Sequence, residues 1–309
     1  MQALVVNDGL LQYVTDQPIP TRDSDQVLIS VSLAGICSTD LEIIKGYSGF
    51  EGVLGHEFVG VVEQGPEEWR GRRVVGSINI GCGQCDTCLA HGPEHCPSRN
   101  VIGIHGYQGA FADYLMLPVA NLYEVPDNVT DEQAVFTEPL AAALRIREQL
   151  VVAPTARTAV IGPGRLGMLV GMILNLAGTK AVMVGRHAKS LELPRQIGLS
   201  TRLVTELEPD SFDMVVEATG NREGLIHALR LVRPLGTVVM KSTYVALSDL
   251  DLTKVVVGEI TLVGSRCGPF APALRLLDSG QVDVLRLIDG EFSLAEGLMG
   301  MARATEPGV

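Results

Sequence analysis

Residues 157–167 read Arg-Thr-Ala-Val-Ile-Gly-Pro-Gly-Arg-Leu-Gly, and this stretch decides the fold of the chain. The apolar run at its start is typical of a buried parallel strand, and the three glycines follow with the spacing Gly-x-Gly-x-x-Gly. Residues 168–177 continue as an apolar helix, and residues 181–184 as a second strand. This order is the context that a dinucleotide-binding motif requires, because the glycines permit a tight turn and the pyrophosphate meets the helix N-terminus.

Further units of the same kind follow along the chain. Apolar, strand-like runs occur at residues 214–220, 237–240 and 260–264, and residues 223–232 form a helix between the first two. Alternating strands and helices predict an α/β fold with a doubly wound parallel sheet of the Rossmann type, which we place at residues 147–267. The candidate cofactor-binding residues are Gly162, Pro163, Gly164, Arg165, Leu166, Gly167, Gly185 and Arg186.

The end of the second predicted strand bears on the choice of cofactor. An NAD-specific site normally carries Asp or Glu there, and that carboxylate holds the ribose hydroxyls. This chain has Gly185 at the corner, followed by Arg186, with Lys189 close by. A missing carboxylate removes repulsion against a 2′-phosphate, and a guanidinium can pair with one through two hydrogen bonds. We therefore expect NADP rather than NAD; the alternative is a solvated Arg186 that stacks on adenine.

The first part of the chain has the pattern of antiparallel β structure. Residues 1–146 contain short apolar runs separated by Gly and Pro turns, and the clearest strand covers residues 27–33. A short helix follows, with Ser38 or Thr39 as its cap. Residues 268–309 return to helices and turns, and we expect them to fold back on this first domain.

A loop in the first domain carries four cysteines at metal-binding spacing. Cys82, Cys85 and Cys88 form two successive C-x-x-C steps, and Cys96 follows seven residues later. Four thiolates suit a tetrahedral zinc ion with no open position, so the expected role is to fold a lobe that has almost no core of its own. The alternative is four unrelated buried thiols, but free cysteines rarely cluster in a polar, Gly-rich loop.

A second candidate metal site involves Cys37, His56 and Glu138. A thiolate, an imidazole and a carboxylate make a three-ligand zinc set that leaves a fourth position open for a substrate oxygen. His56 lies in the stretch Gly-His-Glu-Phe-Val-Gly-Val-Val-Glu-Gln-Gly at residues 55–65. The alternatives are that His56 is a buried structural histidine and that Glu138 is only a charge at a helix start.

The bulk composition excludes several classes of protein. The 309 residues suffice for two domains, and the net charge of −12 disfavours nucleic acid and anionic membranes as partners. The N-terminus lacks the basic and apolar regions of a signal peptide, and the apolar runs are too short to span a membrane. Clustered cysteines indicate metal binding in a reducing compartment. We expect a cytoplasmic protein with a small-molecule substrate.

Together these motifs resemble the zinc-containing medium-chain alcohol and polyol dehydrogenases. The likeness spans nearly the whole chain in the order of that family: Cys37, Gly-His-Glu at 55–57, the four-cysteine lobe, Glu-Pro-Leu at 138–140 and the glycine motif. The resemblance implies a GroES-like β-barrel catalytic domain beside the Rossmann domain. It also implies two zinc ions per chain, one catalytic and one structural. Glu-Pro-Leu is similar to the sorbitol, glucose and threonine dehydrogenase branch, which implies Glu138 as the third catalytic ligand.

The resemblance further implies roles for residues around the catalytic zinc. In that branch Glu57 can also approach the metal, so either Glu57 or Glu138 is the resting carboxylate ligand. Thr39 matches the hydroxyl that passes the substrate proton outward, and Asp40 matches the acid that holds the zinc-bound imidazole. Glu42 stands where some relatives carry a relay histidine, so the proton leaves through Glu42 or through water.

The activity implied by the resemblance is reversible hydride transfer between an alcohol, polyol or sugar carbon and NADP or NAD. One alternative is a zinc-independent enone or quinone reductase on the same scaffold. Another is a catalytically silent, nucleotide-binding redox sensor. Relatives are usually dimers or tetramers, which implies a homodimer or homotetramer here.

Overall fold

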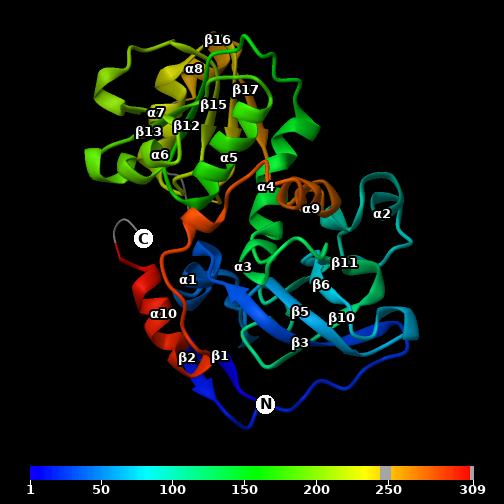
Figure 1. The fold of residues 1–309 in the computed structure, drawn as a ribbon. Coiled ribbons are helices and arrows are strands. Elements are labelled where there is room, and N and C mark those ends of the chain that lie inside the picture. The colour runs from blue at the N-terminus through cyan, green and yellow to red at the C-terminus, as the bar shows by residue number, and fades with distance from the viewer. Residues whose placement is uncertain (244–251, 307–309) are drawn as a thin grey trace. The chain divides into compact units, whose positions relative to one another are not determined.

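The structure is a computed structural model that describes residues 1–243 and 252–306 (Figure 1). The chain falls into two compact units. One contains Met1–Glu138 and the described residues from Phe270 onward, and the other contains Pro139–Pro269. The predicted domain limits at residues 146 and 267 lie close to these breaks. An antiparallel β unit and a unit with a parallel sheet confirm the predicted fold class.

Antiparallel sheets form most of the first unit. Among the described residues, the largest has the strand order β10-β3-β5-β6-β11. Its strands are β3 (Gln26–Gly35), β5 (Glu57–Gln64), β6 (Arg73–Gly76), β10 (Tyr114–Pro118) and β11 (Leu122–Glu124). One smaller sheet contains β1 (Ala3–Asn7), β2 (Leu10–Val14) and β4 (Gly52–Val53). Another contains β7 (Asn79–Ile80), β8 (Asn100–Ile102) and β9 (Gly106–Tyr107).

The pairing of β3 with β5 organises the larger sheet, and Figure 1 shows the two strands side by side. The first half of β5 is almost fully buried, which its run of Phe58, Val59 and Val62 favours. A Cβ at Gly60 would lie 2.3 Å from the carbonyl oxygen of Ser30 on β3. The two backbones approach this closely only because residue 60 is glycine.

Short helices complete the first unit. They are α1 (Ser38–Ile44), α2 (Asp86–His91), α3 (Asp131–Ala134), α9 (Phe270–Asp278), α10 (Gly297–Ala304) and the start of α4 (Thr137–Gln149). The predicted cap of α1 at Ser38 or Thr39 is wrong. Cys37 is the cap, because its backbone N–H donates to Asp40 Oδ2 at 2.8 Å and its own backbone is extended. Ile43 of α1 and Met301 of α10 pack in one core cluster with Leu4 of β1.

The second unit is a parallel sheet with the order β14-β13-β12-β15-β16-β17 in the described part of the chain. Its strands are β12 (Thr158–Ile161), β13 (Val182–Gly185), β14 (Ser200–Leu203), β15 (Phe212–Glu217), β16 (Val232–Met240) and β17 (Thr261–Gly264). Its helices are α5 (Arg165–Leu176), α6 (Glu192–Gln196), α7 (Arg222–Leu231), α8 (Thr253–Val257) and most of α4. This order, with the earliest strand at the centre, is that of a dinucleotide-binding sheet. None of the described helices is both long and apolar enough to cross a membrane.

Two glycines of the predicted fingerprint have distinct structural roles. Gly162 has a φ of +103°, which side chains disfavour, and it turns the chain out of β12. A Cβ at Gly167 would lie 1.9 Å from the Gly162 carbonyl oxygen, so glycine lets α5 pack closely on the end of β12.

Gly167→Ala should destabilise the second unit by about 2–3 kcal/mol, because the new methyl group forces α5 away from β12. Urea unfolding followed by circular dichroism measures this change. Gly164→Ala is the matched control, because that position has no heavy atom within 4 Å of an added Cβ and a φ of −77°. Equal stability of the two variants would contradict the packing role of Gly167.

Candidate metal and cofactor sites

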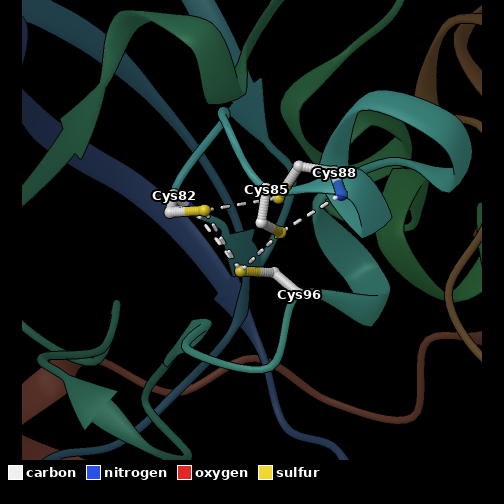
Figure 2. A group of neighbouring side chains, drawn as sticks. All are labelled: Cys82, Cys85, Cys88 and Cys96. Carbon is white, nitrogen blue, oxygen red and sulfur yellow. Dashed lines mark hydrogen bonds between the residues drawn. The ribbon is translucent and has the colours of Figure 1, made fainter.

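The four cysteines of the first unit converge on one point (Figure 2). Sγ–Sγ distances are 3.7 Å for Cys82–Cys96, 3.9 Å for Cys82–Cys88 and 3.9 Å for Cys85–Cys96. A tetrahedron of sulfurs, each about 2.3 Å from a central zinc, has edges of about 3.8 Å. These separations far exceed a disulfide bond of about 2.05 Å, and all four thiols are free. The donor set therefore fits a tetrahedral zinc ion.

Local backbone contacts hold this cluster in shape. Cys85 caps α2, and its Sγ accepts a hydrogen bond from the Cys88 N–H at 3.4 Å. The Cys82 N–H donates to Cys96 Sγ at 3.5 Å. The Ser98 hydroxyl and the Cys82 N–H lower the pKa of Cys96 to about 6, whereas desolvation raises the pKa of Cys88 to about 12. A divalent cation would favour the thiolate at all four positions.

A second donor group lies where α1 meets the start of β5. One ligand atom from each of Cys37, His56 and Glu57 lies within 4.8 Å of the other two. Cys37 follows β3, and the register of the sheet pairs Gly35 with Glu57. This pairing brings the thiol beside the imidazole and the carboxylate, although about twenty residues separate Cys37 from His56 in the sequence. His56 is 3% exposed, and Cys37 is partly buried.

The buried Asp40 carboxylate contacts two residues of this donor group. Its side chain is fully buried; Oδ2 accepts the Cys37 N–H at 2.8 Å, and Oδ1 lies 3.2 Å from His56 Nδ1. A carboxylate facing Nδ1 favours the tautomer with its proton on Nδ1 and leaves the Nε2 lone pair for a metal. The resemblance implied that Asp40 holds a zinc-bound imidazole, and that role stays a prediction.

The protonation of the group also fits a cation site. Burial, and then the charge of Glu57, raise the pKa of Cys37. Burial raises the pKa of Glu57 to about 8, and Glu138 adds to the rise. Burial lowers the pKa of His56, but Asp40 outweighs this and holds that pKa well above its usual value. A divalent cation favours the anionic thiol and carboxyl groups and so reverses their shifts.

The other predicted residues of this site lie at varying distances from it. Glu138, near the start of α4, influences Glu57 electrostatically, but among the described residues the close donor set contains Glu57 and not Glu138. Thr39 Oγ1 lies 3.7 Å from Cys37 Sγ. Glu42 points to solvent and pairs with Lys45 at 2.8 Å.

Sequence reasoning missed the contribution of Gly35. A Cβ at this position would lie 2.6 Å from Glu57 Oε2, so the carboxylate reaches its place only because residue 35 is glycine. In the sequence Gly35 indicates no more than the end of a strand. The register that sets it opposite Glu57 is a property of the folded sheet.

The second unit contains a cavity of about 310 Å³ at the carboxyl ends of β12 and β13. A crevice at this edge is where open parallel sheets bind nucleotides. The predicted residues that line it are Gly162, Pro163, Gly164, Gly185 and Arg186. The other three predicted residues, Arg165, Leu166 and Gly167, form the first turn of α5.

The cavity also has lining residues that the sequence analysis did not include. Thr219 and Asn221 follow β15, and His227 lies on α7. Buried Glu217 holds this loop, because its Oε1 accepts the Thr219 backbone N–H at 2.6 Å. The signal in the sequence was the strand-like run at residues 214–220. In the structure β15 pairs in parallel with β12, so the loop after β15 faces the same crevice.

Comparison with known proteins supplies an independent line of argument. Residues 23–127 match the family model of the alcohol dehydrogenase GroES-like domain. The chain is 30% identical to D-arabitol-phosphate dehydrogenase of Enterococcus avium, over 91% of this chain and 87% of that protein. It is 27% identical to D-arabinitol dehydrogenase 1 of Uromyces fabae, over 90% of this chain and 86% of that protein.

A solved structure resembles the chain over nearly its full length. The protein comes from Sinorhizobium meliloti 1021, is described as a zinc-binding dehydrogenase and is bound to NADP. Its TM-score is 0.87 at 27% identity, and the match covers 97% of this chain and 95% of that one.

Zinc uptake by the Cys37 group should release protons, because the metal displaces them from three groups with raised pKa values, the Cys37 thiol, the Glu57 carboxyl and the His56 imidazolium. At pH 7 we expect a net release of about three protons, and zinc affinity should rise with pH up to the pKa of Cys37. Calorimetry in buffers of different ionisation enthalpy measures the release on protein whose four-cysteine site is already filled. Glu57→Gln should release about one proton fewer. An identical release would exclude Glu57 as a ligand.

Gly35→Ala should weaken zinc retention at the Cys37 group by about tenfold or more, because the added methyl displaces the Glu57 carboxylate. Metal content after dialysis against a chelator should fall by about one zinc ion per chain relative to the unsubstituted protein. Gly264→Ala is the control, because an added Cβ there meets no atom within 4 Å. Retention of both ions by Gly35→Ala would count against the proposed role of Glu57.

Proposed function

The chain belongs to the family of zinc-type medium-chain alcohol and polyol dehydrogenases, and on this premise we propose that its catalysis depends on zinc. Its activity is the NAD(P)-linked oxidation and reduction of alcohol groups. We propose an alcohol, polyol or sugar as the substrate, since relatives named for these reactions include a polyol dehydrogenase and a polyol-phosphate dehydrogenase. The observation that carries the zinc proposal is the convergence of Cys37, His56 and Glu57, with the buried Asp40 carboxylate facing His56.

In this proposal the side chains around the metal have separate roles. Cys37 and His56 hold the ion permanently, and Asp40 keeps the imidazole in the tautomer that leaves Nε2 free. Glu57 is the resting carboxylate ligand, since it lies in the close donor set. Glu138, which is near enough to affect the Glu57 pKa, is the carboxylate that exchanges with it.

The chemistry follows from this arrangement. When bound, zinc supplies a Lewis acid that lowers the pKa of the substrate hydroxyl, and the nicotinamide supplies the hydride acceptor. The Thr39 hydroxyl, beside the Cys37 thiol, receives the substrate proton and passes it outward. Water is the next carrier, because the Glu42 carboxylate is engaged by Lys45 at the surface.

We propose that the cysteine cluster holds a second, structural zinc ion, which gives two ions per chain. Its four sulfurs leave no position for a substrate, so it stabilises the lobe around α2. None of the six cysteines, all of which are in the described part of the chain, forms a disulfide, which fits a reducing compartment such as the cytoplasm.

For the cofactor we propose NADP in preference to NAD. Arg186 lines the nucleotide cavity directly after β13, where its guanidinium can meet a 2′-phosphate. The similar zinc-binding dehydrogenase bound to NADP supports this assignment.

We also propose that the protein is a homodimer, or a homotetramer built from such dimers. β17 ends the parallel sheet, and no described strand pairs with its outer edge. Exposed apolar side chains lie on this strand, at Leu262, and on the helix that precedes it in the chain, at Val256 and Val257 of α8. An unpaired edge with an apolar surround favours pairing with a second copy.

His56→Ala should lower kcat by about a thousandfold or more, because the metal loses a ligand and the substrate its Lewis acid. NADPH binding should change by less than about twofold, since the nucleotide cavity lies in the other unit. A panel of alcohols, polyols and sugars with NADP and NAD, read by absorbance of the reduced cofactor, measures kcat, and a calorimetric titration with NADPH measures cofactor binding. His91→Ala, a change at an exposed histidine, is the control. Full turnover by His56→Ala, or by metal-free protein, would favour a zinc-independent reductase.

A further inference from the structure

An ion pair lies beside the nucleotide cavity, at the position where the sequence indicated only the positive charge of Arg186. Arg186 Nη1 lies 2.5 Å from Glu223 Oε2. Arg186 follows β13, and Glu223 lies in the first turn of α7, so the sheet order brings together two residues from separate elements. Both side chains are more than half exposed, at 56% and 62%.

Arg186 is the cation on which recognition of a 2′-phosphate depends. Among the residues that line the cavity, all of them described, it is the one side chain with a permanent positive charge. His227 lies one turn after Glu223 and also lines the cavity. Burial, and then the charge of Arg230, lower the pKa of His227, so its imidazole adds no charge at neutral pH.

The ion pair changes what can be inferred from the glycine at position 185. In the sequence, a glycine at the end of β13 indicates that no carboxylate opposes a 2′-phosphate. In the folded unit, Glu223 supplies a carboxylate to the same corner from α7. We propose that Glu223 sets the cofactor preference, by competing with the 2′-phosphate of NADP for the Arg186 guanidinium. This inference rests on the proposed nicotinamide dinucleotide cofactor.

The competition has a definite direction. With NAD, which has no 2′-phosphate, the Arg186–Glu223 pair persists and neutralises the guanidinium. With NADP, Arg186 exchanges the carboxylate for a dianion, and Glu223 remains close to that dianion with no cation between them. Exposed ion pairs are weak, so the exchange occurs readily, but the remaining repulsion disfavours NADP. Glu223 thus reduces, without abolishing, the preference for NADP that Arg186 confers.

The test measures binding of two adenosine fragments to the purified protein by calorimetry. Adenosine 2′,5′-bisphosphate carries the 2′-phosphate, and AMP lacks it. Glu223→Gln should tighten binding of the bisphosphate by about three- to tenfold and change AMP binding by less than about twofold. The matched control is Glu192→Gln on α6, an exposed position outside the cavity with the same change of charge, and it should alter neither ligand.

A second comparison asks whether Glu223 acts through Arg186. In an Arg186→Gln background, Glu223→Gln should tighten bisphosphate binding by less than about half as much as in the wild-type background, because no guanidinium remains to be released. An unchanged bisphosphate-to-AMP ratio, equal tightening of both ligands, or an undiminished effect without Arg186 would each overturn the proposal. Thermal melting of each variant checks that the unit is folded.

The outcome is separable from that of the proposed function. The fragments contain no nicotinamide, and their binding requires neither zinc nor an alcohol. A protein without alcohol turnover that still shows the Glu223 effect would contradict the zinc mechanism alone. A protein with full turnover and no Glu223 effect would contradict this inference alone.

Discussion

The candidate metal centre depends on one buried carboxylate. Asp40 is fully buried, and a lone charge in that position would be strongly unfavourable. Its Oδ2 accepts the Cys37 backbone N–H and its Oδ1 lies 3.2 Å from His56 Nδ1, so the contacts that stabilise the charge also position two donor residues. These contacts join the cap of α1, the end of β3 and the start of β5 at the Asp40 carboxylate. A single short helix of seven residues can hold the site because this carboxylate fastens it to the sheet.

Close backbone approach is the second constraint in the first unit. Gly60 lets β5 pass within contact of β3, and Gly35 leaves room for the Glu57 carboxylate beside Cys37. A side chain at position 60 would push β5 away from β3, and one at position 35 would displace the Glu57 carboxylate. The sheet is therefore more than a scaffold, because its register decides which carboxylate accompanies the thiol and the imidazole.

The nucleotide cavity shows the same dependence on strand order. The loops after β12, β13 and β15 meet at one edge because those strands are neighbours in the parallel sheet. Arg186 and Glu223 are 37 residues apart, yet they form an ion pair there. The proposed cofactor preference therefore depends on two residues from separate elements, Arg186 after β13 and Glu223 on α7.

The sequence by itself determined what depends on short-range spacing. The cluster from Cys82 to Cys96 lies within one loop, and the glycine motif joins one strand to the next helix, so both could be identified from the order of residues. The α/β class followed from the periodicity of the later strands. Only the tertiary structure decided that Glu57 lies in the close donor set and that Glu223 faces Arg186. Those contacts depend on sheet register and strand order, which arise from packing between residues far apart in the chain.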